Sequence, residues 1–225
     1  MQNSTQQPVE DNGANQEVER VLLELRAILS EASLQDYIGE DVSQLEHALQ
    51  CAKFAKDSGA DDEVILGSLF HDIGHFCPVT ESMREKLNVG GQLEDQKMGN
   101  CGTQLHEKWG ALYLQELGFS ERVALIVERH VQAKRYLCWK NPEYLKKLSS
   151  ASQTTLSYQG GPMTEQEAQS FEQSALFEVL LKMRTWDDKA KIVGAVVPPL
   201  NAYEPMIRQH LEKQHQQRTV RSLRA

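Results

Sequence analysis

Residues 64–75 read VILGSLFHDIGH, and this stretch decides the prediction of the fold. Together with residues 62 and 63, its first half has apolar residues at helical spacing, and Gly74 interrupts the pattern. His71 and Asp72 lie where the helix ends. Neighbouring residues on an ideal helix point in different directions, but at a helix end the chain can turn enough for both to reach one site. The stretch therefore predicts a helix whose carboxyl end carries two candidate metal ligands.

The same helical spacing recurs along most of the chain. Apolar residues follow it in the ranges 18–29, 42–55, 104–117, 120–134, 142–150, 173–187 and 204–215. Ser43 and Ser120 are suited to begin two of these helices. Alternating strand patterns are scarce, so we expect an all-α fold. The segment 76–103 has four glycines and little periodicity, which predicts a long loop with room for one short helix.

A chain of 225 residues is long enough for one large domain. Residues 1–16 are polar and almost free of bulky apolar side chains, so we expect a disordered tail there. The end of the chain is basic and polar. We therefore predict a tail at 1–16, one domain at 17–212 and a flexible tail at 213–225.

Composition excludes several classes of protein. The chain has 24 Lys and Arg against 32 Asp and Glu, a net charge of −8, which argues against sequence-independent binding of nucleic acid. No apolar run approaches the roughly 20 residues of a membrane span, and the N-terminus lacks the pattern of a secretory signal. The four cysteines (Cys51, Cys77, Cys101 and Cys138) form no CxxC pair, so we expect reduced thiols and a cytoplasmic location.

Histidines are concentrated in one part of the chain. Five of the seven lie between residues 47 and 130: His47, His71, His75, His106 and His130. A single histidine beside apolar residues is most often a core residue, but four on helices, together with Asp72, favour a metal site. Imidazole and carboxylate ligands suit Fe, Mn, Zn or Mg, and the two oxygens of Asp72 can bridge two ions.

This pattern resembles the HD-domain superfamily of all-α metalloproteins. His47, the pair His71-Asp72 and a later aspartate match its ligand set, while His106 and His130 match the two additional histidines of dinuclear members. The later aspartate is identified as Asp187, with Asp188 as the alternative. The resemblance implies an HD-domain helical bundle, with segment 76–103 as an inserted loop.

The resemblance extends to one group within that superfamily. The runs YIGE at 37–40, QLEH at 44–47, HDIGH at 71–75, HEKWGA at 106–111 and HVQAKRYL at 130–137 follow in order. This series is similar to the mixed-valent di-iron oxygenases of the PhnZ/TmpB type, which cleave the carbon–phosphorus bond of 1-hydroxyphosphonates, and it covers about residues 34–190.

Ligand roles follow from this resemblance. It implies two iron ions, as an Fe(II)/Fe(III) pair. His47, His71, Asp72 and Asp187 would hold one iron, and His106 and His130 would hold the other, with Asp72 shared.

Substrate roles also follow from it. The implied residues are Tyr37, Glu40, His75, Lys134, Ser152, Thr155 and Arg184. Lys134 and Arg184 suit a phosphonate dianion, as do the hydroxyls of Ser152 and Thr155. Glu40 suits a cationic nitrogen on the substrate. Tyr37 and His75 are implied to be catalytic as well, Tyr37 as a gate at the iron and His75 as a hydrogen-bond donor to phosphonate or oxygen.

The implied reaction consumes O₂ and a hydroxyphosphonate. A 2-amino substrate would give phosphate and glycine, and a 2-trimethylammonio substrate would give phosphate and glycine betaine. His71 and His106 are 35 positions apart, more than we expect for this group, which leaves the amine end of the substrate open. We favour the trimethylated substrate, with Tyr37, Trp109, Tyr136 and Trp139 as candidate aromatic contacts.

Two other functions fit the same residues. One is a metal-dependent HD phosphohydrolase acting on nucleotides or phosphate esters. The other is a catalytically silent HD module that binds a ligand or partner. Neither composition nor motif decides whether the chain forms a homo-oligomer.

Overall fold

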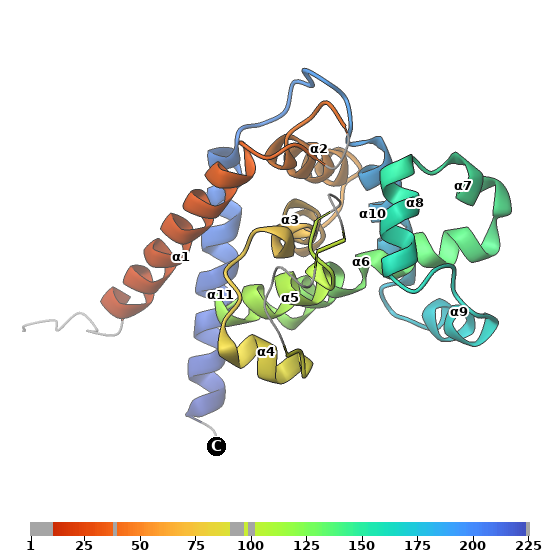
Figure 1. The fold of residues 1–225 in the computed structure, drawn as a ribbon. Helices are drawn as coiled ribbons and strands as arrows, with labels where there is room; N and C mark the ends of the chain where they lie inside the picture. Colours follow the sequence, from red (N-terminus) through yellow and green to blue (C-terminus); the bar gives the residue numbers. More distant parts are fainter. Residues whose placement is uncertain (1–10, 38–39, 91–96, 99–101, 224–225) are drawn as a thin grey trace, which may run out of the picture.

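The computed structural model describes residues 11–37, 40–90, 97–98 and 102–223. Within these residues all regular secondary structure is helical (Figure 1). The all-α prediction is confirmed. The elements are α1 (Asp11–Ala32), α2 (Gln44–Asp57), α3 (Asp62–Phe70), η1 (Ile73–His75), α4 (Glu81–Leu87), α5 (His106–Glu116), α6 (Glu121–Lys140), α7 (Pro142–Lys147), α8 (Ser150–Tyr158), α9 (Glu165–Glu172), α10 (Phe177–Lys189), η3 (Leu200–Ala202) and α11 (Glu204–Ser222).

Side-chain caps set the beginnings of the central helices. Ser43 begins α2 as a capping box with Glu46, and the hydroxyl of Ser120 begins α6, as expected. Asp61 caps α3. Helix α3 ends at Phe70, two residues before the predicted end, so His71 and Asp72 form the turn into η1.

Close backbone packing brings this turn against the next helices. A Cβ on Gly74 would lie 1.8 Å from the carbonyl oxygen of His106, and one on Gly67 would lie 2.5 Å from Cγ2 of Ile126. Only glycine fits at these two contacts. As a result the end of α3 lies directly on α5 and α6, which carry His106 and His130.

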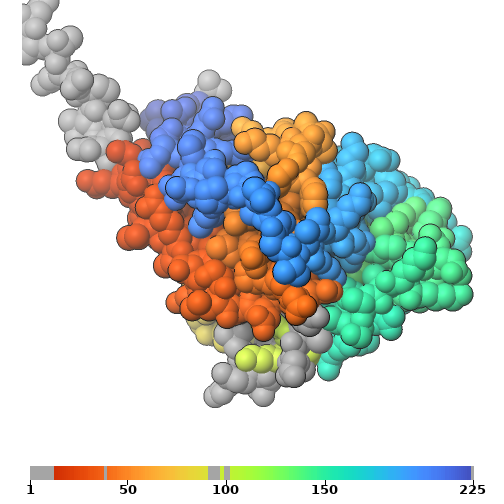
Figure 2. Space-filling view, turned by 90° about the horizontal axis from the view of Figure 1, so that it is seen from above, coloured from red at the N-terminus to blue at the C-terminus, as the bar shows by residue number. Residues whose placement is uncertain are grey.

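The first and last helices, α1 and α11, pack together, far from α7, α8 and α9 (Figures 1 and 2). Helix α1 lies along α11, with ion pairs from Arg26 to Glu204 and from Arg208 to Glu19.

Both terminal helices extend beyond the predicted domain boundaries. Helix α1 begins at Asp11, inside the predicted tail 1–16, and α11 runs to Ser222, inside the predicted tail 213–225. A helix anchored by its buried part adds polar residues at its ends easily, because elongation needs no new nucleus. Residues 1–10 and 224–225 lie outside the described residues.

The described part of the expected loop holds the one short helix allowed for it, whereas two other helices were not predicted. The segment 76–103 contains one short helix, α4, while 91–96 and 99–101 lie outside the described residues. The helical spacing did not predict α8 and α9, because each buries only two residues. No helix in the described part of the chain has the length and apolar character to cross a membrane.

Candidate active site

Four histidines meet in two pairs near the centre of the bundle. Nε2 of His47 lies 3.1 Å from Nε2 of His71, and Nε2 of His106 lies 3.2 Å from Nε2 of His130. All four side chains are buried. They come from α2, from the end of α3, from the start of α5 and from α6, so the fold brings together all four histidines that the sequence assigns to metal.

The other ring nitrogen of each histidine faces a backbone carbonyl. The acceptors are Ala190 for His47, Ser68 for His71, Thr103 for His106 and Val127 for His130, at 2.7–3.3 Å. A carbonyl only accepts, so each Nδ1 carries the proton and Nε2 of each ring faces the site. This second hydrogen bond is typical of metal-binding histidines. Burial alone would lower the pKa of His71, but the carboxylates of Asp72 and Asp187 raise this pKa to about 9, so this ring can also hold a proton at Nε2.

The two Nε2 atoms of each pair meet across about 3 Å. When both rings of a pair are neutral, their lone pairs face each other, an arrangement that a cation held between them would satisfy. The donor set therefore fits two metal ions, one for each pair.

Asp72 lies between the two pairs. Its Oδ2 is 3.2 Å from Nε2 of His71 and 3.7 Å from Nε2 of His47. Its Oδ1 is 3.4 Å from Nε2 of His106 and 3.5 Å from Nε2 of His130. Burial alone would raise the pKa of Asp72, but the imidazoles hold this pKa well below its usual value, so the carboxylate is ionised. Each oxygen thus serves one histidine pair, as a bridging carboxylate would.

Asp187 lies beside the first pair and Asp188 does not. Oδ1 of Asp187 is 3.4 Å from Nε2 of His47, whereas Asp188 accepts hydrogen bonds from Tyr144 and Arg184. This geometry favours Asp187 as the later aspartate of the set.

Two further residues adjoin the histidine pairs. Cys51, to which the sequence assigns no role at the site, has its Sγ 3.7 Å from Nε2 of His47. Burial raises the pKa of this thiol well above its usual value, which disfavours the thiolate that binds metals. His75 stacks on His106 with ring centroids 3.9 Å apart. Its Nδ1 accepts a hydrogen bond from the Thr103 N–H, so Nε2 of the neutral ring carries the proton and can donate.

Tyr37 covers the first pair. Its ring stacks on His47 with centroids 3.7 Å apart, and its hydroxyl donates to Oδ1 of Asp187 at 3.3 Å. Burial raises the pKa of this hydroxyl well above its usual value, and the carboxylates of Asp187 and Asp72 add to the effect. The phenol is therefore protonated and within reach of the candidate metal ligands.

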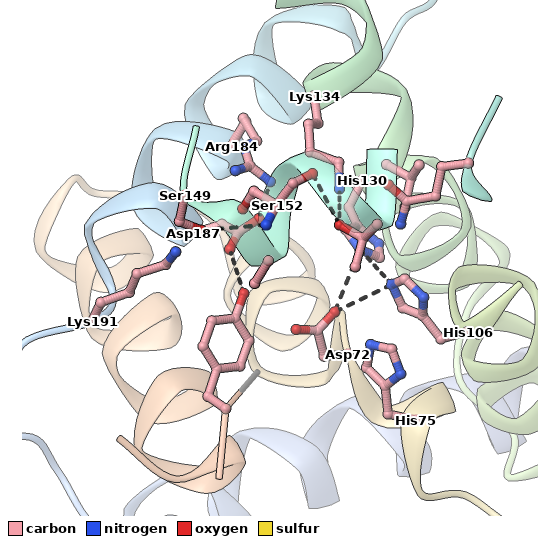
Figure 3. Close-up of a pocket in the computed structure, with 15 residues that line it drawn as sticks. Asp72, His75, His106, His130, Lys134, Ser149, Ser152, Arg184, Asp187 and Lys191 are labelled. Atoms are coloured by element: carbon pink, nitrogen blue, oxygen red, sulfur yellow. Dashed lines mark hydrogen bonds and ion pairs between the residues drawn. The ribbon is translucent and has the colours of Figure 1, made fainter. Parts of the chain in front are cut away.

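A pocket opens over the histidine pairs and is lined by cationic and hydroxyl side chains (Figure 3). Lys134 is buried and donates to Oγ1 of Thr155 at 2.9 Å. Burial, with the nearby charge of Arg184, lowers the pKa of Lys134 to about 8. Ser152 and Thr155 both line this pocket from α8. The four residues that the sequence assigns to the phosphonate are thus brought together.

Arg184 is held in place by three neighbours. It donates to Oδ2 of Asp187 at 2.7 Å, to the Tyr144 hydroxyl at 2.7 Å and to Asp188. Burial alone would lower its pKa, but the two aspartates keep this pKa well above its usual value, so the guanidinium stays charged. The result is a fixed cation at the pocket wall.

Lys191 also lines the pocket, and sequence reasoning missed it. Its Nζ lies 2.8 Å from Oε1 of Glu40, the carboxylate that was expected to receive a cationic substrate group. Lys191 follows α10 in a segment without helical spacing, so no pattern in the sequence points to it.

Only one of the four expected aromatic contacts lies at the pocket. Tyr37 lines it, whereas Trp109 is buried in the core with its indole N–H donating to the Gln104 carbonyl. Tyr136 donates to Glu172 and packs at an angle against the rings of Trp139, Phe171 and Phe177. The expectation for Trp109, Tyr136 and Trp139 is therefore wrong, because these side chains fill other parts of the protein.

Comparison with known proteins places the chain in a family. The HD domain family matches residues 45–168, more than half of the chain. A hydroxymethylphosphonate dioxygenase of Gimesia maris is 39% identical over 178 residues, 79% of this chain and 82% of the relative. A [1-hydroxy-2-(trimethylamino)ethyl]phosphonate dioxygenase (glycine-betaine-forming) of Leisingera caerulea is 34% identical over 80% of this chain and 84% of the relative. An uncharacterized protein of Acanthamoeba polyphaga mimivirus is 35% identical over 88% and 87%.

The chain therefore belongs to the HD-domain family. Within that family, the predicted resemblance to oxygenases of the PhnZ/TmpB type is confirmed by the two dioxygenases.

Proposed function

We propose that this protein is a di-iron oxygenase that uses O₂ to cleave the carbon–phosphorus bond of a 1-hydroxyphosphonate. The observation that carries the proposal is the placement of two imidazole pairs on opposite oxygens of Asp72, beneath a pocket with Lys134 and Arg184. A redox-active centre beside a dianion pocket suits this reaction. The names of two relatives support the same chemistry.

The proposed ligands follow the two pairs. His47, His71 and Asp187 would hold one iron, and His106 and His130 the other, with Asp72 bridging them. When bound, the irons supply the electrons and the open coordination positions that O₂ activation requires.

The pocket side chains bind and orient the substrate. Lys134 and Arg184 provide charge-assisted hydrogen bonds to the phosphonate, and the hydroxyls of Ser152 and Thr155 add neutral ones. His75 donates from Nε2 toward the phosphonate or oxygen. Tyr37, stacked on His47, closes the site before substrate enters, and Tyr37 and His75 are the proposed catalytic residues.

The proposed reaction balances without an external reductant. The carbon–phosphorus bond breaks, one atom of O₂ enters the carboxylate and the other enters phosphate. Carbon 1 and phosphorus together supply the four electrons that O₂ accepts, and one proton is released. Hydroxymethylphosphonate would give formate, the 2-amino substrate glycine, and the 2-trimethylammonio substrate glycine betaine.

Oxygen uptake and phosphate release test the proposal together. The iron-loaded protein is incubated with hydroxymethylphosphonate, 2-amino-1-hydroxyethylphosphonate or 2-trimethylammonio-1-hydroxyethylphosphonate. We expect equal amounts of O₂ consumed and phosphate formed with at least one of them. Protein carrying His71→Ala or Asp72→Ala is the metal-free control and should do neither. Phosphate released without oxygen would refute the oxygenase and favour the HD phosphohydrolase.

We also place the enzyme in the cytoplasm. Cys51, Cys77 and Cys138 are free thiols and all are buried, as expected for a protein that matures under reducing conditions. Mass spectrometry of the protein from its native cells, with and without alkylation, tests this.

A further inference from the structure

Lys191 places its ammonium group where a cationic substrate would place its own. The Nζ atom lies 2.8 Å from Oε1 of Glu40 and 5.7 Å from the centroid of the Tyr37 ring. A carboxylate and an aromatic face are the two partners that a quaternary ammonium requires. In this protein the Lys191 ammonium already contacts both of these partners, the Glu40 carboxylate and the Tyr37 ring.

The backbone on each side of Lys191 is anchored to α2. The Ala190 carbonyl accepts from Nδ1 of His47 at 2.9 Å. The Ile192 N–H donates to Oε1 of Gln50 at 3.0 Å, and the Ile192 carbonyl accepts from Nε2 of Gln50 at 3.1 Å. Gln50 is 2% exposed, so these bonds are shielded from water. Lys191 is therefore fixed at the pocket and is not a mobile surface lysine.

The other described charges of the pocket offer an ammonium no alternative partner. Asp72 and Asp187, the carboxylates that line it, both face the histidine pairs. Lys134 and Arg184 are cations. One face of Tyr37 is covered by His47. A cationic substrate would have to displace Lys191 from Glu40 and then lie next to its charge, which is unfavourable.

We propose that Lys191 determines substrate specificity, by pairing with Glu40 and thereby excluding 1-hydroxyphosphonates that carry a cationic group. This inference rests on the proposed function and names its substrate class: 1-hydroxyalkylphosphonates with an uncharged substituent or none. It replaces the trimethylated substrate favoured by the sequence.

A pair of substrates of equal shape separates charge from size. They are 2-trimethylammonio-1-hydroxyethylphosphonate and (1-hydroxy-3,3-dimethylbutyl)phosphonate, in which carbon replaces the quaternary nitrogen. Hydroxymethylphosphonate is the small reference. Wild-type enzyme, Lys191→Ala and the control Lys189→Ala are compared, because Lys189 carries the same charge two residues away but is exposed and does not line the pocket. Affinities are measured by calorimetry without oxygen, and kcat/KM is measured with oxygen.

We expect wild-type enzyme to prefer both neutral substrates to the cationic one. Lys191→Ala should shift the ratio of cationic to isosteric neutral substrate by at least about tenfold toward the cation, in affinity as well as in kcat/KM. Lys189→Ala should leave this ratio within about twofold of wild type, as befits an exposed charge. Lys191→Met, which keeps the apolar stem, replaces Lys191→Ala if the latter does not fold.

Two results would overturn the inference: a wild-type preference for the cationic substrate over its neutral isostere, or an unchanged ratio in a folded Lys191 variant. Failure of the proposed function looks different. In that case iron-loaded wild-type enzyme consumes no oxygen with any of these phosphonates.

Discussion

Asp72 gives the candidate site one carboxylate oxygen for each histidine pair. Each of its oxygens faces a different histidine pair at 3.2–3.7 Å. It can do so because α3 ends at Phe70, and residues 71 and 72 turn toward the site.

Asp187 and Asp188 form a matched test of the ligand set. Asp187→Asn should lower the iron content from about two to about one per chain, because a neutral amide is a poor metal ligand. Asp188→Asn should keep both irons but raise KM up to about tenfold, because Arg184 loses a positioning partner. Elemental analysis and steady-state kinetics measure the two effects. Iron lost from Asp188→Asn alone would identify Asp188 as the ligand.

Lys134 should make substrate affinity depend on pH. Its pKa of about 8 means that the charged donor is present below that pH and is lost as the pH rises through it. We therefore expect KM to increase above about pH 8. Lys134→Arg stays protonated at higher pH, so its KM should remain low there. The measurement is KM from about pH 6 to about pH 9.5; parallel curves for wild type and Lys134→Arg would assign the titration to another group.

Helical spacing pointed to the four histidines and the family resemblance supplied Tyr37 and Glu40, but neither pointed to Lys191. His47, His71, His106 and His130 stand beside apolar helix positions, so their convergence could be predicted. Lys191 lies in an irregular segment, and its place depends on hydrogen bonds to His47 and Gln50 that are over 140 residues away. No local pattern encodes such a contact.

At the scale of elements, the contact between η1 and α5 sets the distance between the two candidate metal positions. Helices with a clear apolar face were predictable. Helices α8 and α9 were not, although α8 supplies Ser152 and Thr155 to the pocket. A short helix that packs a few residues on a larger body leaves little periodic signal.

Gly74→Ala should disrupt this contact. The new methyl would lie 1.8 Å from the His106 carbonyl oxygen, so α5 must shift. We expect a loss of about 2 kcal/mol or more in the free energy of unfolding, or a melting temperature lower by about 5 °C. Iron should be lost as well. Gly90→Ala, where a Cβ meets no atom of the described residues within 4 Å, is the control. Calorimetry measures the stability and elemental analysis measures the iron content. If Gly74→Ala were as stable and as rich in iron as Gly90→Ala, the proposed role of the contact between η1 and α5 would be wrong.

At the scale of the whole molecule, the net charge of −8 gives no sign of the cationic side chains that line the pocket. Lys134 and Arg184 line the pocket. The paired helices α1 and α11 lie far from α7, α8 and α9 (Figures 1 and 2). The overall charge argues against nucleic-acid binding, but it does not predict whether a local pocket binds a small anion.

A fragment of residues 17–212 should keep the site intact. The described side chains from 13 to 17 and from 213 to 223 are mostly exposed, whereas Ile207 and Leu211 are buried. We expect full iron content, kcat/KM within about twofold of the whole chain and a melting temperature only a few degrees lower. A fragment that ends at residue 203 removes Ile207 and Leu211 and should be unstable. Loss of iron from the 17–212 fragment would show that the terminal turns support the site.

The anchoring of residue 191 has a consequence for how such an enzyme can diversify. The bonds that orient His47 and hold Gln50 use the main chain of Ala190 and Ile192, not the side chain between them. We therefore expect that a substitution at 191 can change the range of phosphonate substrates and leave the hydrogen bonds to His47 and Gln50 unchanged. The proposed specificity residue, Lys191, directly follows Ala190, whose carbonyl orients His47. A mutation at 191 should nevertheless alter substrate choice without altering the orientation of His47.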